Sequence, residues 1–215
     1  MPLREALVFF GCLVAAIILH EISHGVVALW FGDDTAKRAG RLTLNPLPHI
    51  DPFGSIILPA MGALTGLPII GFAKPVPVSP ARLRNPRRDM LFVSLAGPFT
   101  NFLLMAVAAL ITRSLLRGGG FLGTGVGADN PDLAVRIFFA FAAINLLLGL
   151  FNFLPIPPLD GSAMVERILP ANWLSGWHRF RPYGILVLFV LVFSTNVVGS
   201  VIEPFFDALR DFVVA

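Results

Sequence analysis

The sequence is poor in cysteine and in charge, and each shortage excludes a class of protein. Its 215 residues include one cysteine, Cys12, so no disulfide can form within the chain. Only 13% of the residues are charged, against about 25% in a typical soluble domain, while 56% are hydrophobic. The 16 basic residues barely exceed the 13 acidic ones and are spread over several segments, so we expect no nucleic-acid-binding patch. The composition indicates a membrane protein with several spans.

Four apolar stretches are long enough to cross a bilayer as helices, which takes about 20 residues. They cover roughly residues 5–31, 90–115, 133–154 and 183–202. A fifth stretch, 53–71, is interrupted by four glycines and two prolines. It is expected to dip into the membrane and return as a re-entrant loop or hairpin, although a full fifth span stays open. We therefore predict an all-α polytopic membrane protein with about four core transmembrane helices and a single domain, residues 1–215.

The basic residues indicate how this chain is oriented. If 53–71 does not cross, the loops 32–89 and 155–182 share one side and hold eleven of the 16 Lys and Arg residues. If 53–71 does cross, the sides carry nine and seven, and the bias nearly vanishes. Because basic loops stay in the cytoplasm, we predict four spans in the inner or plasma membrane, with the N-terminus outside. An active site near Asp160 would then be closer to the cytoplasmic side.

The most informative motif lies inside the first predicted span, where His20-Glu21-Ile22-Ser23-His24 matches H-E-x-x-H. Residues four apart face the same side of a helix, so both imidazoles can bind one zinc ion. The glutamate beside the first histidine can then act as general base on the attacking water. Because an ionisable group costs roughly 2.5–3.5 kcal/mol at the membrane centre, its presence there indicates a function. A polar helix-packing cluster or a proton relay is the alternative interpretation.

A catalytic zinc usually has three protein ligands, so the two histidines need a third. The strongest candidate is Asp160 in NFLPIPPLDG (152–161), because the prolines before it would unwind the third span and direct it inward. The alternative is that Asp160 caps the helix that follows. His49 and Asp51, just before the membrane-dipping segment, could also approach the metal, although turn chemistry beside neighbouring prolines explains them equally well.

Together these motifs resemble the site-2 protease family of intramembrane zinc metalloproteases. The resemblance rests on H-E-x-x-H followed by a small residue at Ala28, on SLAGPFTN (94–101), and on N-x-x-P-x-P-x-x-D-G from Asn152 to Gly161. LNPLPHIDPFGS (44–55) and GFAKPVPVSP (71–80) are similar to the compact bacterial branch, which lacks PDZ and CBS domains. The matches extend over nearly the whole chain.

The resemblance implies both a site and a topology. His20, His24 and Asp160 would bind one Zn²⁺ per chain, and Glu21 would be the catalytic base. Asn152, together with Asn145, would help to hold the substrate or the oxyanion. In this family the H-E-x-x-H helix and the D-G helix run in the same direction, which requires an odd number of crossings between them. The family also carries a membrane-dipping β segment at the place of 53–71, able to pair with an extended substrate.

The motifs and the resemblance lead to a hypothesis of function. We expect an intramembrane zinc endopeptidase that cleaves transmembrane segments of other membrane proteins, as in regulated intramembrane proteolysis. Its partners would be the lipid bilayer and a transmembrane protein substrate, while the sequence leaves the oligomeric state unknown. The alternative is a transporter or channel that uses the buried histidines and carboxylates as a proton or metal-ion path. That alternative leaves the one-turn spacing of the two histidines unexplained.

Overall fold

A computed structural model of the chain describes residues 3–51, 57, 73–117, 133–194 and 197–215. In this part of the chain every regular element is a helix, which confirms the predicted all-α class. The predicted membrane-dipping segment, 53–71, lies outside the described residues except for residue 57. Its re-entrant or β form therefore stays a prediction.

Three of the described helices are long and apolar enough to cross a membrane: α1 (Leu3–Trp30), α4 (Pro86–Arg117) and α5 (Leu133–Phe153). They contain 28, 32 and 21 residues. At about 1.5 Å per residue each reaches at least the roughly 30 Å of a hydrocarbon core. These helices correspond to the first three predicted spans.

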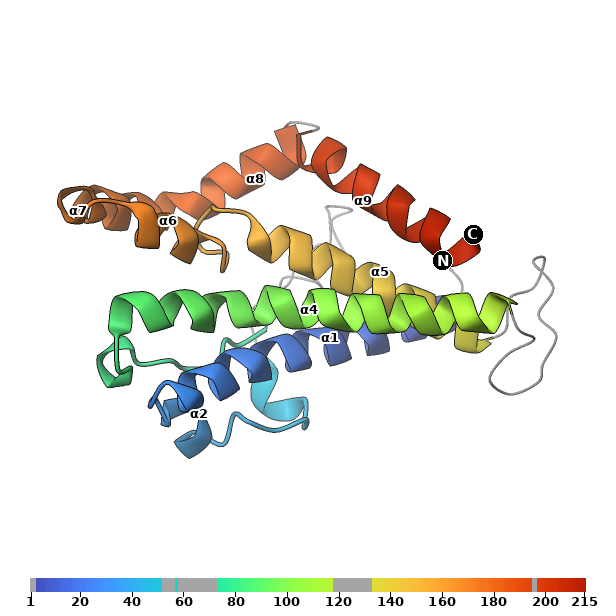
Figure 1. Cartoon of the computed structure of the whole chain (residues 1–215), viewed down its shortest axis with the longest axis horizontal. Helices are drawn as coiled ribbons and strands as arrows, with labels where there is room; N and C mark the ends of the chain where they lie inside the picture. The colour runs from blue at the N-terminus through green and yellow to red at the C-terminus, as the bar shows by residue number, and fades with distance from the viewer. Residues whose placement is uncertain (1–2, 52–56, 58–72, 118–132, 195–196) are drawn as a thin grey trace.

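The three spanning helices form the centre of the molecule. Figure 1 shows them lying alongside one another, with α4 running opposite to α1 and α5. All three pairs are in contact, and α4 packs against both of the others. Because α1 and α5 run in the same direction, the end of α1 and the loop after α5 lie toward the same end of the bundle. That arrangement is the one that a single intervening crossing produces.

The fourth predicted span, 183–202, does not form one continuous helix. It falls on α8 (Gly184–Ser194) and on the start of α9 (Val197–Val214), which meet at an angle in Figure 1. α8 has 11 residues, about 17 Å as a helix, and is shorter than the hydrocarbon core. α9 has 18 residues, about 27 Å as a helix, and carries four charged side chains: Glu203, Asp207, Arg210 and Asp211. The predicted count of four spans is therefore not confirmed, and three described helices meet the requirements.

Small side chains bring the helices close together. Ala108 of α4 and Ala142 of α5 are buried in one cluster with Leu209 and Val213 of α9. Ala16 of α1 is fully buried in a second cluster, against α5. Helices in a membrane associate through close van der Waals packing rather than through the hydrophobic effect, and small residues permit that approach. As a result, polar side chains on α1, α4 and α5 can reach one another inside the bundle.

The remaining short helices lie in the segments that follow α1 and α5 along the chain. They are α2 (Thr35–Arg38), η1 (Leu47–His49), η3 (Pro80–Arg82), α6 (Ser162–Ile168), α7 (Ala171–Phe180) and η4 (Arg181–Tyr183). Figure 1 shows α2, α6 and α7 at the left end of the molecule. An extended segment, residues 73–79, joins this end to α1, because Val76 donates to Glu21 and Ser79 donates to Asp33.

Candidate metal centre

The two histidines of the H-E-x-x-H motif lie one turn apart on α1 with their rings directed to one point. The Nε2 atoms of His20 and His24 are 3.1 Å apart, and both side chains are buried. Oδ2 of Asp160 lies 3.1 Å from Nε2 of His20 and 3.4 Å from Nε2 of His24. One ligand atom from each of the three residues therefore falls within 4.8 Å of the others. The structure brings together the three residues expected to bind a metal.

The backbone after α5 directs Asp160 toward α1. The helix ends at Phe153, and the proline-containing loop that follows turns back so that the Gly161 N–H donates to the Asn152 carbonyl at 2.7 Å. A Cβ at Gly161 would collide with the backbone carbonyls of Phe153 and Leu154, so only glycine permits this turn. Asp160 immediately precedes that glycine. The D-G pair thus combines a candidate metal ligand with the turn that places it.

The alternative role of Asp160, as the cap of the next helix, does not match the geometry. The N-cap residue of α6 is Gly161, and no side-chain hydrogen bond caps that helix. The carboxylate of Asp160 is turned toward the histidines instead.

The hydrogen bonds around the histidines indicate which ring nitrogens carry protons. Nδ1 of His24 lies 2.7 Å from the carbonyl oxygen of Val93, which can only accept, so that nitrogen must carry the hydrogen. Nε2 of a neutral His24 then presents a lone pair. Nδ1 of His20 has a similar contact, 2.5 Å from Oδ1 of Asn101. In their neutral forms both rings therefore direct an unprotonated Nε2 toward Asp160.

The donor set at the meeting point fits a cation. It consists of two imidazole lone pairs and a carboxylate oxygen. Oδ2 of Asp160 is buried and accepts no hydrogen bond of acceptable geometry within the described part of the chain. Three acceptors so close to each other repel unless a positive ion lies between them. Two His nitrogens and one carboxylate oxygen are a ligand set of catalytic zinc, which leaves a fourth position free.

Glu21 lies beside this group but does not belong to it. Its side chain is half-buried, and Oε2 accepts the backbone N–H of Val76 at 2.7 Å. Within the described residues the converging group comprises only His20, His24 and Asp160. A carboxylate that is held next to a metal site without binding the metal is suited to a general base.

Asn145 and Asn152, the two predicted substrate-binding residues, occupy different environments. Asn145 is fully buried in α5 and hydrogen-bonds to Asn101 and to the carbonyl of Phe141. Asn152 is half-buried, and its Nδ2 donates to the carbonyl of Leu148 at 3.0 Å. Asn145 thus has no exposed surface in this arrangement, whereas Asn152 lies next to the turn that carries Asp160.

Two further residues at this site, Gly97 and Asn101 of α4, had no role assigned from the sequence. A Cβ at Gly97 would lie 2.5 Å from Nε2 of His20 and 2.6 Å from Nε2 of His24. Gly97 therefore leaves the space that the two rings and an ion need. The sequence feature that could have indicated them is the SLAGPFTN segment (94–101). Gly97 and Asn101 are four residues apart in it and so share one face of α4.

His49 and Asp51, the other candidate ligands, do not join the group. His49 is buried, and its Nε2 lies 3.0 Å from the carbonyl oxygen of Thr43. Neither residue is among those whose ligand atoms converge in the described structure.

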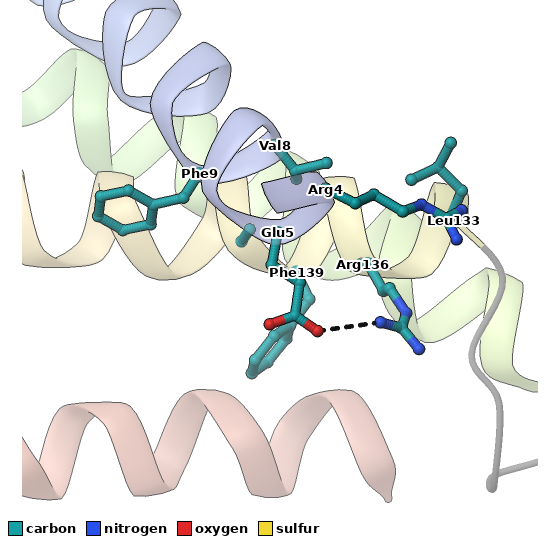
Figure 2. Close-up of a pocket in the computed structure, with 8 residues that line it drawn as sticks. Arg4, Glu5, Val8, Phe9, Leu133, Arg136 and Phe139 are labelled. Atoms are coloured by element: carbon teal, nitrogen blue, oxygen red, sulfur yellow. Dashed lines mark hydrogen bonds and ion pairs between the residues drawn. The ribbon is translucent and has the colours of Figure 1, made fainter. Parts of the chain in front are cut away.

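A hollow of about 360 Å³ lies far from this centre, between the first turns of α1 and α5. Figure 2 shows Arg4, Glu5 and Arg136 at its rim, where Glu5 pairs with Arg136 at 3.3 Å. Its other walls are apolar side chains, among them Phe9 and Phe139. None of the three converging residues lines this hollow, and the candidate metal site lies in the other half of α1.

Comparison with known proteins agrees with a zinc-binding site of a protease. The family model described as peptidase family M50 matches residues 113–195. The chain is 36% identical over 202 residues to "Putative zinc metalloprotease YwhC" of Bacillus subtilis, covering 94% of this chain and 87% of that protein. It is also 36% identical over 207 residues to "Putative zinc metalloprotease Rip2" of Mycobacterium tuberculosis, covering 92% of this chain and 72% of that protein. No solved structure gives a significant match.

Proposed function

The chain belongs to peptidase family M50 and is a zinc metalloprotease, and from this premise we propose that it hydrolyses peptide bonds within transmembrane segments of other membrane proteins. The observation that carries the proposal is the convergence of His20, His24 and Asp160 inside a bundle of membrane-spanning helices. A protease whose ligands lie on and beside spanning helices meets its substrates most readily within the membrane. Its substrate would be a transmembrane protein.

In this proposal His20, His24 and Asp160 hold one Zn²⁺ through two Nε2 atoms and one carboxylate oxygen. Zinc, when bound, polarises the scissile carbonyl and makes water a stronger nucleophile at neutral pH. Glu21 takes the proton from the attacking water and returns it to the leaving amine. The N–H of Val76 engages Oε2 of Glu21, and we assign that proton transfer to Oε1.

We assign Asn152 to substrate binding, in the sense of an amide that holds the peptide or the developing oxyanion. Its position supports this role, because its backbone carbonyl accepts the N–H of Gly161, next to Asp160. Its Nδ2 carries two N–H groups, and one of them donates to the carbonyl of Leu148, so the other is the donor that we assign to the substrate. Asn145 has no exposed surface for such a contact.

We further propose a multi-pass protein of the inner or plasma membrane, with the active site toward the cytoplasm. Eleven of the 16 basic residues fall in the segments 32–89 and 155–182, which flank the end of the bundle that carries Asp160. Basic segments are retained on the cytoplasmic side. Water would then reach the catalytic group from that side.

The test uses purified full-length protein in liposomes with a model transmembrane substrate. Wild type should release a product cut within the span, and a zinc chelator should abolish cleavage. Glu21→Gln should retain zinc and lose cleavage by several orders of magnitude, because the amide fills the same volume but cannot accept the water proton.

Two outcomes would contradict the proposal. Cleavage by Glu21→Gln at the wild-type rate would remove Glu21 from the mechanism. Zinc or proton flux across the liposome without any cleavage would favour the transporter alternative.

A further inference from the structure

A chain of hydrogen bonds connects the backbone of α5 to the first histidine of α1. Nδ2 of Asn145 donates to the carbonyl of Phe141 at 2.8 Å. Oδ1 of Asn145 accepts from Nδ2 of Asn101 at 2.8 Å. Oδ1 of Asn101 lies 2.5 Å from Nδ1 of His20. Both asparagines have no exposed surface, so water does not compete for these bonds.

The direction of every bond in this chain follows from its first member. A backbone carbonyl can only accept, so the amide of Asn145 must turn its NH₂ toward Phe141 and its oxygen toward α4. That oxygen requires the NH₂ of Asn101, which leaves the oxygen of Asn101 facing His20. An oxygen at this position requires a proton on Nδ1. The neutral ring therefore presents its lone pair at Nε2, the atom that faces Asp160.

His24 is held in the same tautomer by a direct contact with a backbone carbonyl. Nδ1 of His24 contacts the carbonyl of Val93 directly. Each ring thus has its tautomer fixed by a backbone carbonyl, through one contact at His24 and through two asparagines at His20. Without those asparagines nothing among the described neighbours of Nδ1 of His20 would select one tautomer.

We propose that Asn145 is a positioning residue for the metal site: acting through Asn101, it sets the tautomer of His20. The proposal rests on zinc binding as part of the proposed function, and it concerns residues that do not touch the metal. Partners of this kind typically contribute 10–100-fold to metal affinity. We expect Asn145→Leu to weaken zinc binding by about tenfold or more, because Asn101 is then free to turn its NH₂ toward His20.

The test has two readouts on the full-length protein in detergent. Competition with a chelator gives the zinc dissociation constant. Nitrogen-15 NMR of ring-labelled histidine, recorded on the same preparation after zinc removal, gives the tautomer of His20, which is assigned by comparison with His20→Asn. Wild type should show a single tautomer with the proton on Nδ1, and Asn145→Leu should show a mixture. Neither readout requires cleavage, so failure of the proteolysis proposal is seen separately.

Thr112→Val is the matched control. Thr112 is as fully buried in α4 as Asn101 and donates only to the carbonyl of Ala108 in its own helix. It should leave both the zinc affinity and the tautomer at wild-type values. Equal effects of Thr112→Val and Asn145→Leu would show that Asn145 acts only as a packed polar residue and would overturn the proposal.

A second pair of variants distinguishes an effect transmitted through Asn101 from a general disturbance of helix packing. In Asn101→Asp the carboxylate can only accept, so His20 keeps its Nδ1 proton whatever stands at position 145. Asn145→Leu should then no longer change the tautomer. If Asn145→Leu produced the same proportions of the two His20 tautomers with Asn and with Asp at position 101, the effect would not pass through Asn101, and the proposal would be contradicted. Should Asn101→Asp fail to fold, the comparison of Asn145→Leu with Thr112→Val decides the matter.

Discussion

At the scale of single residues, the absence of a side chain at Gly97 leaves room beside both histidines. Alanine would put a methyl group 2.5 Å from Nε2 of His20 and 2.6 Å from Nε2 of His24. We expect Gly97→Ala to lower zinc affinity and the cleavage rate by about tenfold or more, even though alanine favours a helix by about 1 kcal/mol over glycine. Metal analysis and the cleavage assay measure both effects.

Gly11→Ala is the control for this substitution. Gly11 also lies within a spanning helix, and a Cβ there meets nothing within 4 Å. It should leave zinc content and activity unchanged. If Gly97→Ala behaved like Gly11→Ala, the space above the two rings would not be required by the metal.

Asp160→Asn distinguishes a metal ligand from a structural carboxylate. Asparagine has nearly the same shape and caps helices as well as aspartate does, but a neutral amide is a poor zinc ligand. We therefore expect loss of bound zinc and at least a tenfold loss of cleavage, with the helical circular dichroism unchanged. Stoichiometric zinc and full activity in this variant would place the third ligand elsewhere.

The sequence predicted the three residues that converge because their spacing carries the geometry. His20 and His24 are one helical turn apart, and three prolines and a glycine around Asp160 indicate a turn. Asn145 was expected near the substrate, but its buried position depends on which face of α5 meets α4. Gly97 and Asn101 belong to a motif visible in the sequence, yet their roles depend on distances between helices. Such distances are properties of the packing and cannot be obtained from spacing along one chain.

At the scale of elements, the extended segment 73–79 is held to the end of α1 by Asp33. Oδ1 of Asp33 accepts from the backbone and the hydroxyl of Thr35, and Oδ2 accepts the N–H of Ser79 at 2.6 Å. Burial by itself raises the pKa of Asp33. The bonds from Thr35 and Ser79 and the charge of Arg82 outweigh it, so the pKa lies below its ordinary value. The same segment carries Val76, whose N–H donates to Glu21, the proposed general base.

This pKa shift predicts a dependence of stability on pH. Because the pKa of Asp33 is lower in the folded than in the unfolded chain, its stabilisation is complete above the unfolded-state value of about 3.9. It is lost as the pH falls through the lower folded-state value. Thermal unfolding in detergent should show Asp33→Asn well below wild type near neutral pH, with the difference shrinking at pH values below about 4.

The neighbouring residue gives the matched control for this pH series. Asp34 is substantially exposed and pairs with Arg38 and Arg82 at 2.9 Å. Exposed ion pairs contribute little, so Asp34→Asn should change the melting temperature only slightly at any pH. A difference between Asp33→Asn and wild type that stayed constant down to strongly acidic pH would contradict the assignment.

The helices themselves were predictable to different degrees. α1, α4 and α5 are continuous apolar stretches, and their bounds follow the predicted spans within a few residues. The stretch 183–202 is equally apolar, but the structure divides it between α8 and α9. One face of α9, with Leu209 and Val213, packs against the cluster of α4 and α5. Such packing on neighbouring helices competes with a continuous helix, and hydropathy along one segment does not include it.

At the scale of the whole molecule, the direction of the bundle predicts which loops face which side. In a Cys12→Ala background, a cysteine at Arg84, before α4, should react with an impermeant maleimide only after cells are permeabilised. A cysteine at Leu133, where α5 begins, should react in intact cells. Both positions are exposed and lie at opposite ends of the spanning helices. Labelling of both from the same side would refute the proposed orientation.

The metal site also determines when during biosynthesis this protease can become active. His20 and His24 enter the membrane with the first helix, whereas Asp160 follows the third spanning helix, 160 − 20 = 140 residues after His20. At about 5–20 residues per second, translation separates the first ligand from the last by roughly 7–28 seconds. Asn101 and Asn145 also emerge after His20, whose ring Asn101 contacts. Under the proposed function, a nascent chain therefore has an incomplete centre, and cannot cleave neighbouring membrane proteins, until its third span and Asp160 have been made.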